Sequence, residues 1–119
     1  MSMGTVVLFI VGIMMGSVGA LCMKVGALKL PDFSPTPGYA VAFVSSPYIM
    51  SGFFLYFVPA VIWTYLLAKL PVSIVQPILA LTYVVTPVLA LMFLGEPVPV
   101  LRWLGIAVII IGVVIVAGT

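Results

Sequence analysis

Charged side chains are nearly absent from this chain. Six of its 119 residues are charged, and 66% are hydrophobic. A soluble domain of this size carries roughly a quarter of its residues charged, so this surface must face lipid instead of water. Four basic residues are also too few for an electrostatic footprint, which excludes nucleic acid as a partner. The six are Lys24, Lys29, Asp32, Lys69, Glu96 and Arg102.

Side chains that perform chemistry are equally scarce. Cys22 is the only cysteine, which excludes a disulfide within the chain, and histidine is absent. The sequence contains no paired carboxylates and no cluster with metal-ligand spacing. We therefore expect no cofactor, no metal and no enzymatic activity.

Four long apolar runs fill the chain instead, at about 5–28, 48–68, 72–94 and 98–117. Each is close to the roughly 20 residues that cross a bilayer. The first is too long, and lacks the basic flank, for a cleavable signal peptide. The short connections "KLPV" and "GEPVP" predict antiparallel neighbours. We predict an all-α membrane protein, with a single domain over 1–119 forming a four-transmembrane-helix bundle.

Between the first two runs lies the longest connection, in which "YAVAFV" is expected to form a short interfacial helix. Lys24, Lys29 and Arg102 fall at one end of the predicted bundle, and Lys69 at the other. The positive-inside rule favours the end with three cations as cytoplasmic, with both termini outside. Because the bias is small, dual insertion stays open.

Small and polar residues recur at helical spacing within the runs. Gly12, Gly16 and Gly19 share one face of the first. Such a stripe permits close helix packing in lipid, or forms the floor of a cavity.

Polar groups that point into lipid cost several kcal/mol on water-to-hydrocarbon scales, so they should face protein or a wet cleft. Pro59, Pro77 and Pro87 also leave backbone carbonyls without their helical donors. The alternatives are a kinked helix bonded internally and a ligand path. For the second we expect a cleft lined by Ser17, Tyr56, Trp63, Gln76 and Tyr83.

In the fourth run, Gly105 and Gly112 make a flat, narrow face. Four short helices are too few to surround a cavity on all sides while also presenting an apolar surface to the lipid. We expect a second copy, or a similar subunit, to pack through this run as a homodimer or heterodimer.

The second half of the chain, from "LPVSIVQP" through the "GEP" turn to "RWLGIAVIIIGV", resembles the last two helices of the drug/metabolite transporter superfamily. With four helices it resembles the small multidrug resistance branch. "ALCMK" and "PVSIVQP" are most similar to the four-helix subunits that flip aminoarabinose-phosphoundecaprenol in Gram-negative bacteria. The resemblance implies a transporter in a bacterial or archaeal cytoplasmic membrane.

The sequence differs from the drug-exporter branch of the superfamily at one position that matters for function. In the drug exporters a membrane-embedded glutamate, which binds cation and protons, falls on the position of Gly16. No carboxylate lies inside any run here, which disfavours proton-coupled cation export. The exporters' dimer motif does match, at Gly105, Gly112 and Val113.

The remaining charges allow two compatible interpretations. Lys24 and Glu96 can form an ion pair that ties the first run to the third and fourth. Lys24 and Arg102 can instead bind an anionic phosphate at the headgroup level. Lys69, at the opposite end, either receives that phosphate or is an ordinary snorkelling lysine.

The resulting hypothesis is a flippase that moves a polyprenyl-phosphate-linked sugar, or a related anionic membrane lipid, between leaflets. The alternatives are an exporter of drugs or small metabolites, and a membrane scaffold subunit that transports nothing.

Overall fold

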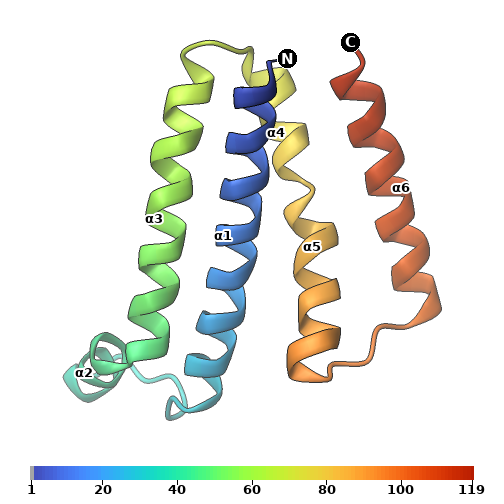
Figure 1. Ribbon diagram of the computed structural model, residues 1–119. Helices are drawn as coiled ribbons and strands as arrows, with labels where there is room; N and C mark the ends of the chain where they lie inside the picture. The colour runs from blue at the N-terminus through green and yellow to red at the C-terminus, as the bar shows by residue number, and fades with distance from the viewer. Residues whose placement is uncertain (1) are drawn as a thin grey trace.

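The computed structural model describes residues 2–119, and every regular element among them is helical. Four apolar helical segments are long enough to cross a membrane: Met3–Leu28, Pro47–Leu67, Val72–Leu94 and Val100–Ala117. They run antiparallel to their chain neighbours, which puts the described ends of the chain at the same end of the bundle (Figure 1). The predicted fold class, an all-α bundle with four membrane-spanning helices, is confirmed.

Helices α1 (Met3–Leu28) and α3 (Pro47–Leu67) form the tightest pair. A Cβ added to Gly52 would lie 2.9 Å from the carbonyl oxygen of Gly19, and one added to Gly26 would lie 2.6 Å from Cγ1 of Ile49. Without a hydrophobic driving force in lipid, such close backbone approach is what holds helices together. At Gly19 the glycine stripe of α1 therefore serves helix packing.

The third span, expected as one apolar run over about 72–94 with a kinked helix as one alternative, is divided into shorter elements. It consists of α4 (Val72–Leu79), α5 (Thr82–Leu89) and a π-helical turn, η1 (Ala90–Leu94). Pro77 has no N–H and its ring crowds the preceding turn. The amides of Ala80 and Leu81 bond to carbonyls three residues back, at 3.0 and 3.1 Å, which tightens the chain at the break.

The last helix, α6 (Val100–Ala117), packs on α4 and α5 at the edge of the bundle (Figure 1). The turn before it uses Gly95 at φ 67°, a left-handed conformation that glycine adopts without steric cost. A small apolar core joins the four spans near the two termini. It comprises Phe9, Ile13, Leu66, Val75, Ile78 and Val113.

The helix expected from "YAVAFV" is present as α2 (Pro37–Ser45). It lies across the foot of α3 and is seen nearly end-on in Figure 1. Phe43 of α2 contacts Phe53 of α3, with 5.8 Å between the ring centroids.

Replacing Gly52 by alanine should destabilise the α1–α3 pair, because the new methyl group would lie 2.5 Å from Cγ of Met23 and 2.9 Å from the carbonyl oxygen of Gly19, and the backbone cannot turn aside as a side chain can. We expect a loss of about 1–3 kcal/mol, the usual range for overpacking. Unfolding in mixed detergent and dodecyl sulfate micelles measures it. Gly4→Ala is the control, because Gly4 is exposed on the same helix as Gly19 and the nearest atom to its added Cβ is Oγ of Ser2, 3.9 Å away. Equal unfolding midpoints for the two variants would contradict the packing role of Gly52.

Candidate functional site: a polar cleft between the helices

A cleft lies between α1, α3 and the broken third span. It consists of a cavity of about 380 Å³ and an adjoining one of about 300 Å³. The two share Gly16, Tyr56, Thr82 and Tyr83. The larger is lined further by Gly12, Pro59, Ala60, Trp63, Gln76, Leu79 and Ala80, and the smaller by Ala20, Thr86 and Pro87.

Glycines of α1 make the floor of this cleft. A Cβ on Gly12 would collide with the indole ring of Trp63, so the ring lies directly on the glycine. At Gly16 the nearest atom to an added Cβ is Cε1 of Tyr56, 4.0 Å away, so the space above Gly16 is open. The glycine stripe thus has both expected roles: helix packing at Gly19 and cavity floor at Gly16.

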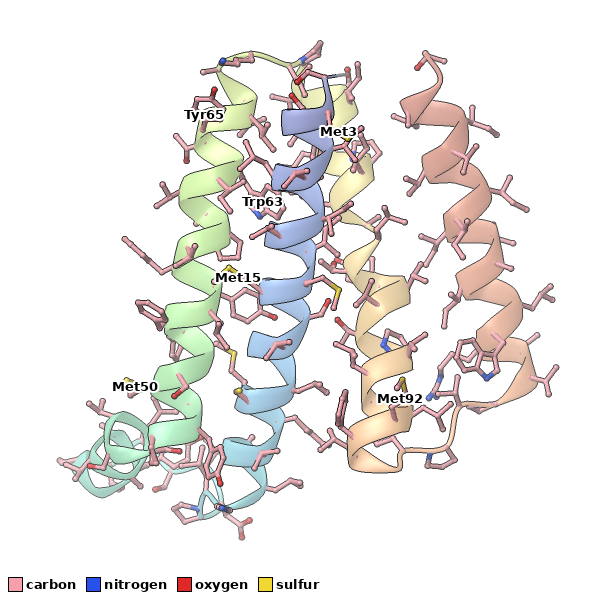
Figure 2. All side chains as sticks on the ribbon, in the orientation of Figure 1. Met3, Met15, Met50, Trp63, Tyr65 and Met92 are labelled. Atoms are coloured by element: carbon pink, nitrogen blue, oxygen red, sulfur yellow. The ribbon has the colours of Figure 1, made fainter. Side chains whose placement is uncertain are left out.

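Trp63 forms a wall of the cleft. Its side chain reaches from α3 toward α1, in the half of the bundle nearer the described chain ends (Figure 2), and its ring lies 6.0 Å from that of Phe9. Since α1 carries glycine at position 12, the bulky indole fits without separating the two helices.

Polar groups in the cleft have no partners within residues 2–119. The side-chain hydrogen bonds found there are all local, and none involves Gln76, Tyr56 or Tyr83. Thr82 is the exception, because its hydroxyl donates to the carbonyl of Leu79 at 2.9 Å across the helix break. One amide and two phenols therefore remain available to water or a ligand.

Ser17 does not line the cleft, although the sequence placed it there. It is fully buried, and its hydroxyl has no hydrogen-bond partner within the described chain. Its neighbour Gly16 takes the place facing the cavities. Adjacent positions on a helix point about 100° apart, so only one of the two can face the opening.

Lys24 and Glu96 lie together at one end of the bundle. Nζ of Lys24 is 3.6 Å from Oε1 of Glu96, and their side chains are 49% and 46% exposed. Such an exposed pair stabilises a fold by less than about 1 kcal/mol. Lys24 is one helical turn, roughly 6 Å, beyond Ala20, which lines the smaller cavity. The ammonium group is therefore just past one end of the cleft.

Arg102 and Lys69 lie outside the cleft. Arg102 is exposed at the start of α6, at the same end of the bundle as Lys24. Lys69 lies at the opposite end, with its ammonium 4.6 Å from the ring centroid of Tyr65, and lines a separate cavity of about 450 Å³ with Ser2 and Thr5. The structure therefore separates the cations by bundle end, as the sequence predicted.

The proposed dimer residues do not share a face. Gly105 and Gly112 point outward, with nothing within 4 Å of an added Cβ. Val113 is 7% exposed and packs in the core beside Ile78. Within one chain Val113 is already covered, so it is not available to a second copy on the glycine face.

Carboxylates are confined to the connections. Within residues 2–119, Asp32 lies between α1 and α2, and Glu96 lies between η1 and α6. The middle of the cleft consequently holds neutral donors, acceptors and aromatic rings.

Sequence reasoning did not name several lining positions, namely Ala20, Ala60, Leu79, Ala80 and Thr82. Helical spacing from Gln76 selects Leu79 and Ala80 but not Thr82, which follows the break after Leu79. The polar pair Thr82–Tyr83, following Pro77 by one to two turns, was the available signal.

An open polar cleft between membrane-spanning helices is typical of a membrane transporter. Comparison with family models agrees, since the EamA-like transporter family matches residues 2–118. The chain belongs to this family, and so is an integral membrane transporter of the drug/metabolite superfamily. Members of this family are transporters and not enzymes. No curated protein and no solved structure matches the chain.

Water in the cleft can be tested with cysteine labelling in a Cys22→Ser background. We expect Gln76→Cys to react with a membrane-impermeant maleimide, because thiolates form only where water reaches them. Val108→Cys is the control, since Val108 is 61% exposed on α6 and faces lipid. Equal labelling of the two positions would mean that the cleft is no wetter than the outer surface.

Proposed function

We propose that this transporter moves a polyprenyl-phosphate-linked sugar, or a related anionic lipid, between leaflets of a bacterial or archaeal cytoplasmic membrane. One observation carries the proposal: an open cleft between the helices places an amide and two phenols in a mostly apolar lining that contains no carboxylate. A buried acidic group would repel a phosphate and attract cations, whereas neutral donors do neither.

The headgroup is suited to the cleft. A sugar presents hydroxyls that both donate and accept, and the amide of Gln76 and the phenols of Tyr56 and Tyr83 offer the same capacity. The indole of Trp63 supplies a flat apolar wall for a sugar ring. Gly16 leaves room for the headgroup against α1.

A phosphate would be bound first at the end of the cleft that carries Lys24. The ammonium of Lys24 has three donors, and Glu96 occupies one side of it. Arg102, exposed at the same end, adds a planar fork that matches phosphate oxygens. At the other end Lys69 would receive the phosphate after crossing.

The lipid tail would stay outside. Helix α1 packs against both α3 and α5, but α3 and α5 hardly touch each other. The cleft is therefore open on its side between these two helices, where Tyr56 and Tyr83 are 43% and 67% exposed. A headgroup can occupy the cleft while its isoprenoid chain extends into lipid through this opening.

A second subunit would complete the pathway. The outward face of α6 at Gly105 and Gly112 is narrow and free of contacts, as close helix association in lipid requires. We propose a homodimer, or a heterodimer with a similar four-helix subunit, formed through this face.

Replacing Lys24 by alanine should weaken binding of a fluorescent polyprenyl phosphate about fivefold, the effect of one cation at a membrane surface. Lys24→Arg should retain binding because it keeps the charge. Proteoliposomes with the labelled lipid on both leaflets, treated with an impermeant quencher, report binding and crossing separately. If Lys24→Ala binds and moves the lipid like the unmodified protein, Lys24 has no part in phosphate capture.

Gln76→Leu should slow headgroup crossing about tenfold or more, because it removes a hydrogen bond to a polar headgroup while keeping the side-chain volume. The same proteoliposomes measure it. Ser73→Ala, one turn away on α4 and not lining the cleft, is the matched control. A rate for Gln76→Leu equal to that of Ser73→Ala would remove Gln76 from the pathway.

A second candidate is export of an organic cation. Three aromatic rings, those of Tyr56, Trp63 and Tyr83, line the cleft, and such rings attract cations through their faces. Tetraphenylphosphonium uptake by the same vesicles tests it. Because no carboxylate lies in the cleft, the rate of tetraphenylphosphonium uptake should be the same at about pH 6 and about pH 8.

The scaffold alternative predicts a different outcome. Vesicles that move neither the polyprenyl phosphate nor tetraphenylphosphonium, while a glycosyltransferase partner stays bound to the protein, would favour it.

A further inference from the structure

A second polar cavity lies at the foot of the bundle, apart from the cleft. It has a volume of about 300 Å³ and lies between the end of α1, the end of α2 and the start of α3. Its polar lining comes from Lys29, Ser45, Ser46 and Tyr48, with Gly26 contributing backbone. None of these residues lines the cleft or takes part in the transport steps proposed above.

Lys29 is held in place in this cavity without being neutralised. Its ammonium lies 4.2 Å from the ring centroid of Tyr48, a cation–π contact that fixes the long side chain. Within residues 2–119 the salt bridge found is that of Lys24 with Glu96, so Lys29 forms none, even with nearby Asp32. A positioned ammonium with unused donors is suited to an anion.

Hydroxyl groups of two serines complete the lining. Ser46 accepts a hydrogen bond from the amide of Ile49 at 3.4 Å, which leaves its own O–H to donate. Ser45 is exposed and makes no side-chain hydrogen bond within the described residues. Together with Lys29, these groups match the non-bridging oxygens of a phosphodiester.

Helix α2 places the cavity at the depth of lipid headgroups. Its nine residues carry no charge, and Val41 and Val44 are each 63% exposed. Phe33, just before it, is 78% exposed. Apolar side chains this exposed at the end of a membrane bundle belong in the boundary between headgroups and acyl chains, as on interfacial helices. The cavity therefore opens where phospholipid phosphates lie.

We infer that this cavity, formed by Lys29, Ser45, Ser46 and Tyr48, binds the phosphate of an anionic phospholipid whose acyl chains pack along α2. A phosphatidylglycerol headgroup presents the anion with only hydroxyls beyond it. The quaternary ammonium of phosphatidylcholine would bring a second cation close to Lys29, so we expect preference for the former.

Native mass spectrometry of the full chain, titrated with phosphatidylglycerol or phosphatidylcholine, tests this site. We expect one phosphatidylglycerol retained preferentially, with affinity reduced about fivefold in Lys29→Ala and restored in Lys29→Arg. Ser51→Ala removes an exposed hydroxyl of α3 that lines neither this cavity nor the cleft, and should leave phosphatidylglycerol binding unchanged.

Equal binding by the Lys29→Ala and Ser51→Ala variants, or no preference between the two lipids, would overturn the site. If excess inorganic phosphate displaced the lipid, the assignment of a lipid as the ligand of this cavity would be wrong. Ser45→Ala gives a second measurement that leaves the helix cap at Ser46 intact, and unchanged lipid binding in it would contradict the assigned lining. Transport of polyprenyl phosphate is read in separate vesicles, so failure there does not affect this result.

Discussion

The hydrocarbon core of a membrane offers no hydrogen bonds, and this constraint shapes the whole molecule. Backbone groups must be paired within helices, which leaves four long helical spans as the workable solution. Side chains that cannot pair within a helix must meet protein or water. Gln76, Tyr56 and Tyr83 make no side-chain hydrogen bond among residues 2–119, and all three are exposed residues that line the open cleft. The cleft is thus the part of the bundle that tolerates polar side chains without a hydrogen-bond partner in the protein.

The same constraint explains how α1 serves two purposes. In lipid, burying large apolar side chains between helices gives no hydrophobic stabilisation, so helices associate through small residues that allow close packing. At Gly19 and Gly26 the missing side chains let α3 approach closely. At Gly12 the space is taken by an indole, and at Gly16 it stays open. The same stripe of glycines therefore packs against α3 at one end and forms the floor of a cavity further along, because different residues of α3 face it at each point.

Much of this arrangement follows from sequence spacing. The spans were predicted from apolar runs, and four of five proposed cleft residues line it, because period and polarity together select a helix face. Ser17 failed because adjacent residues on α1 cannot share a face, and the choice between Gly16 and Ser17 depends on where α3 and α5 pack. Val113 packs in the core of the single chain, away from the face of Gly105 and Gly112, because the rotation of α6 about its axis decides which side meets the core. Thr82 was missed because Pro77 predicts a kink but not the helix break after Leu79.

The charged side chains are placed where binding of an anion to them would change the stability of the fold little. The Lys24–Glu96 pair is half exposed and contributes little to stability, so a phosphate can compete for Lys24 without loosening the bundle. The helix pair that carries most of the packing, α1 with α3, depends on the contact between Gly19 and Gly52, which line neither the cleft nor the cavity at Lys29. Lys29 and Lys69 are each held against a tyrosine ring at opposite ends of that pair. Binding at either membrane surface is therefore compatible with a rigid α1–α3 unit, and any movement that opens or closes the cleft falls to the broken third span.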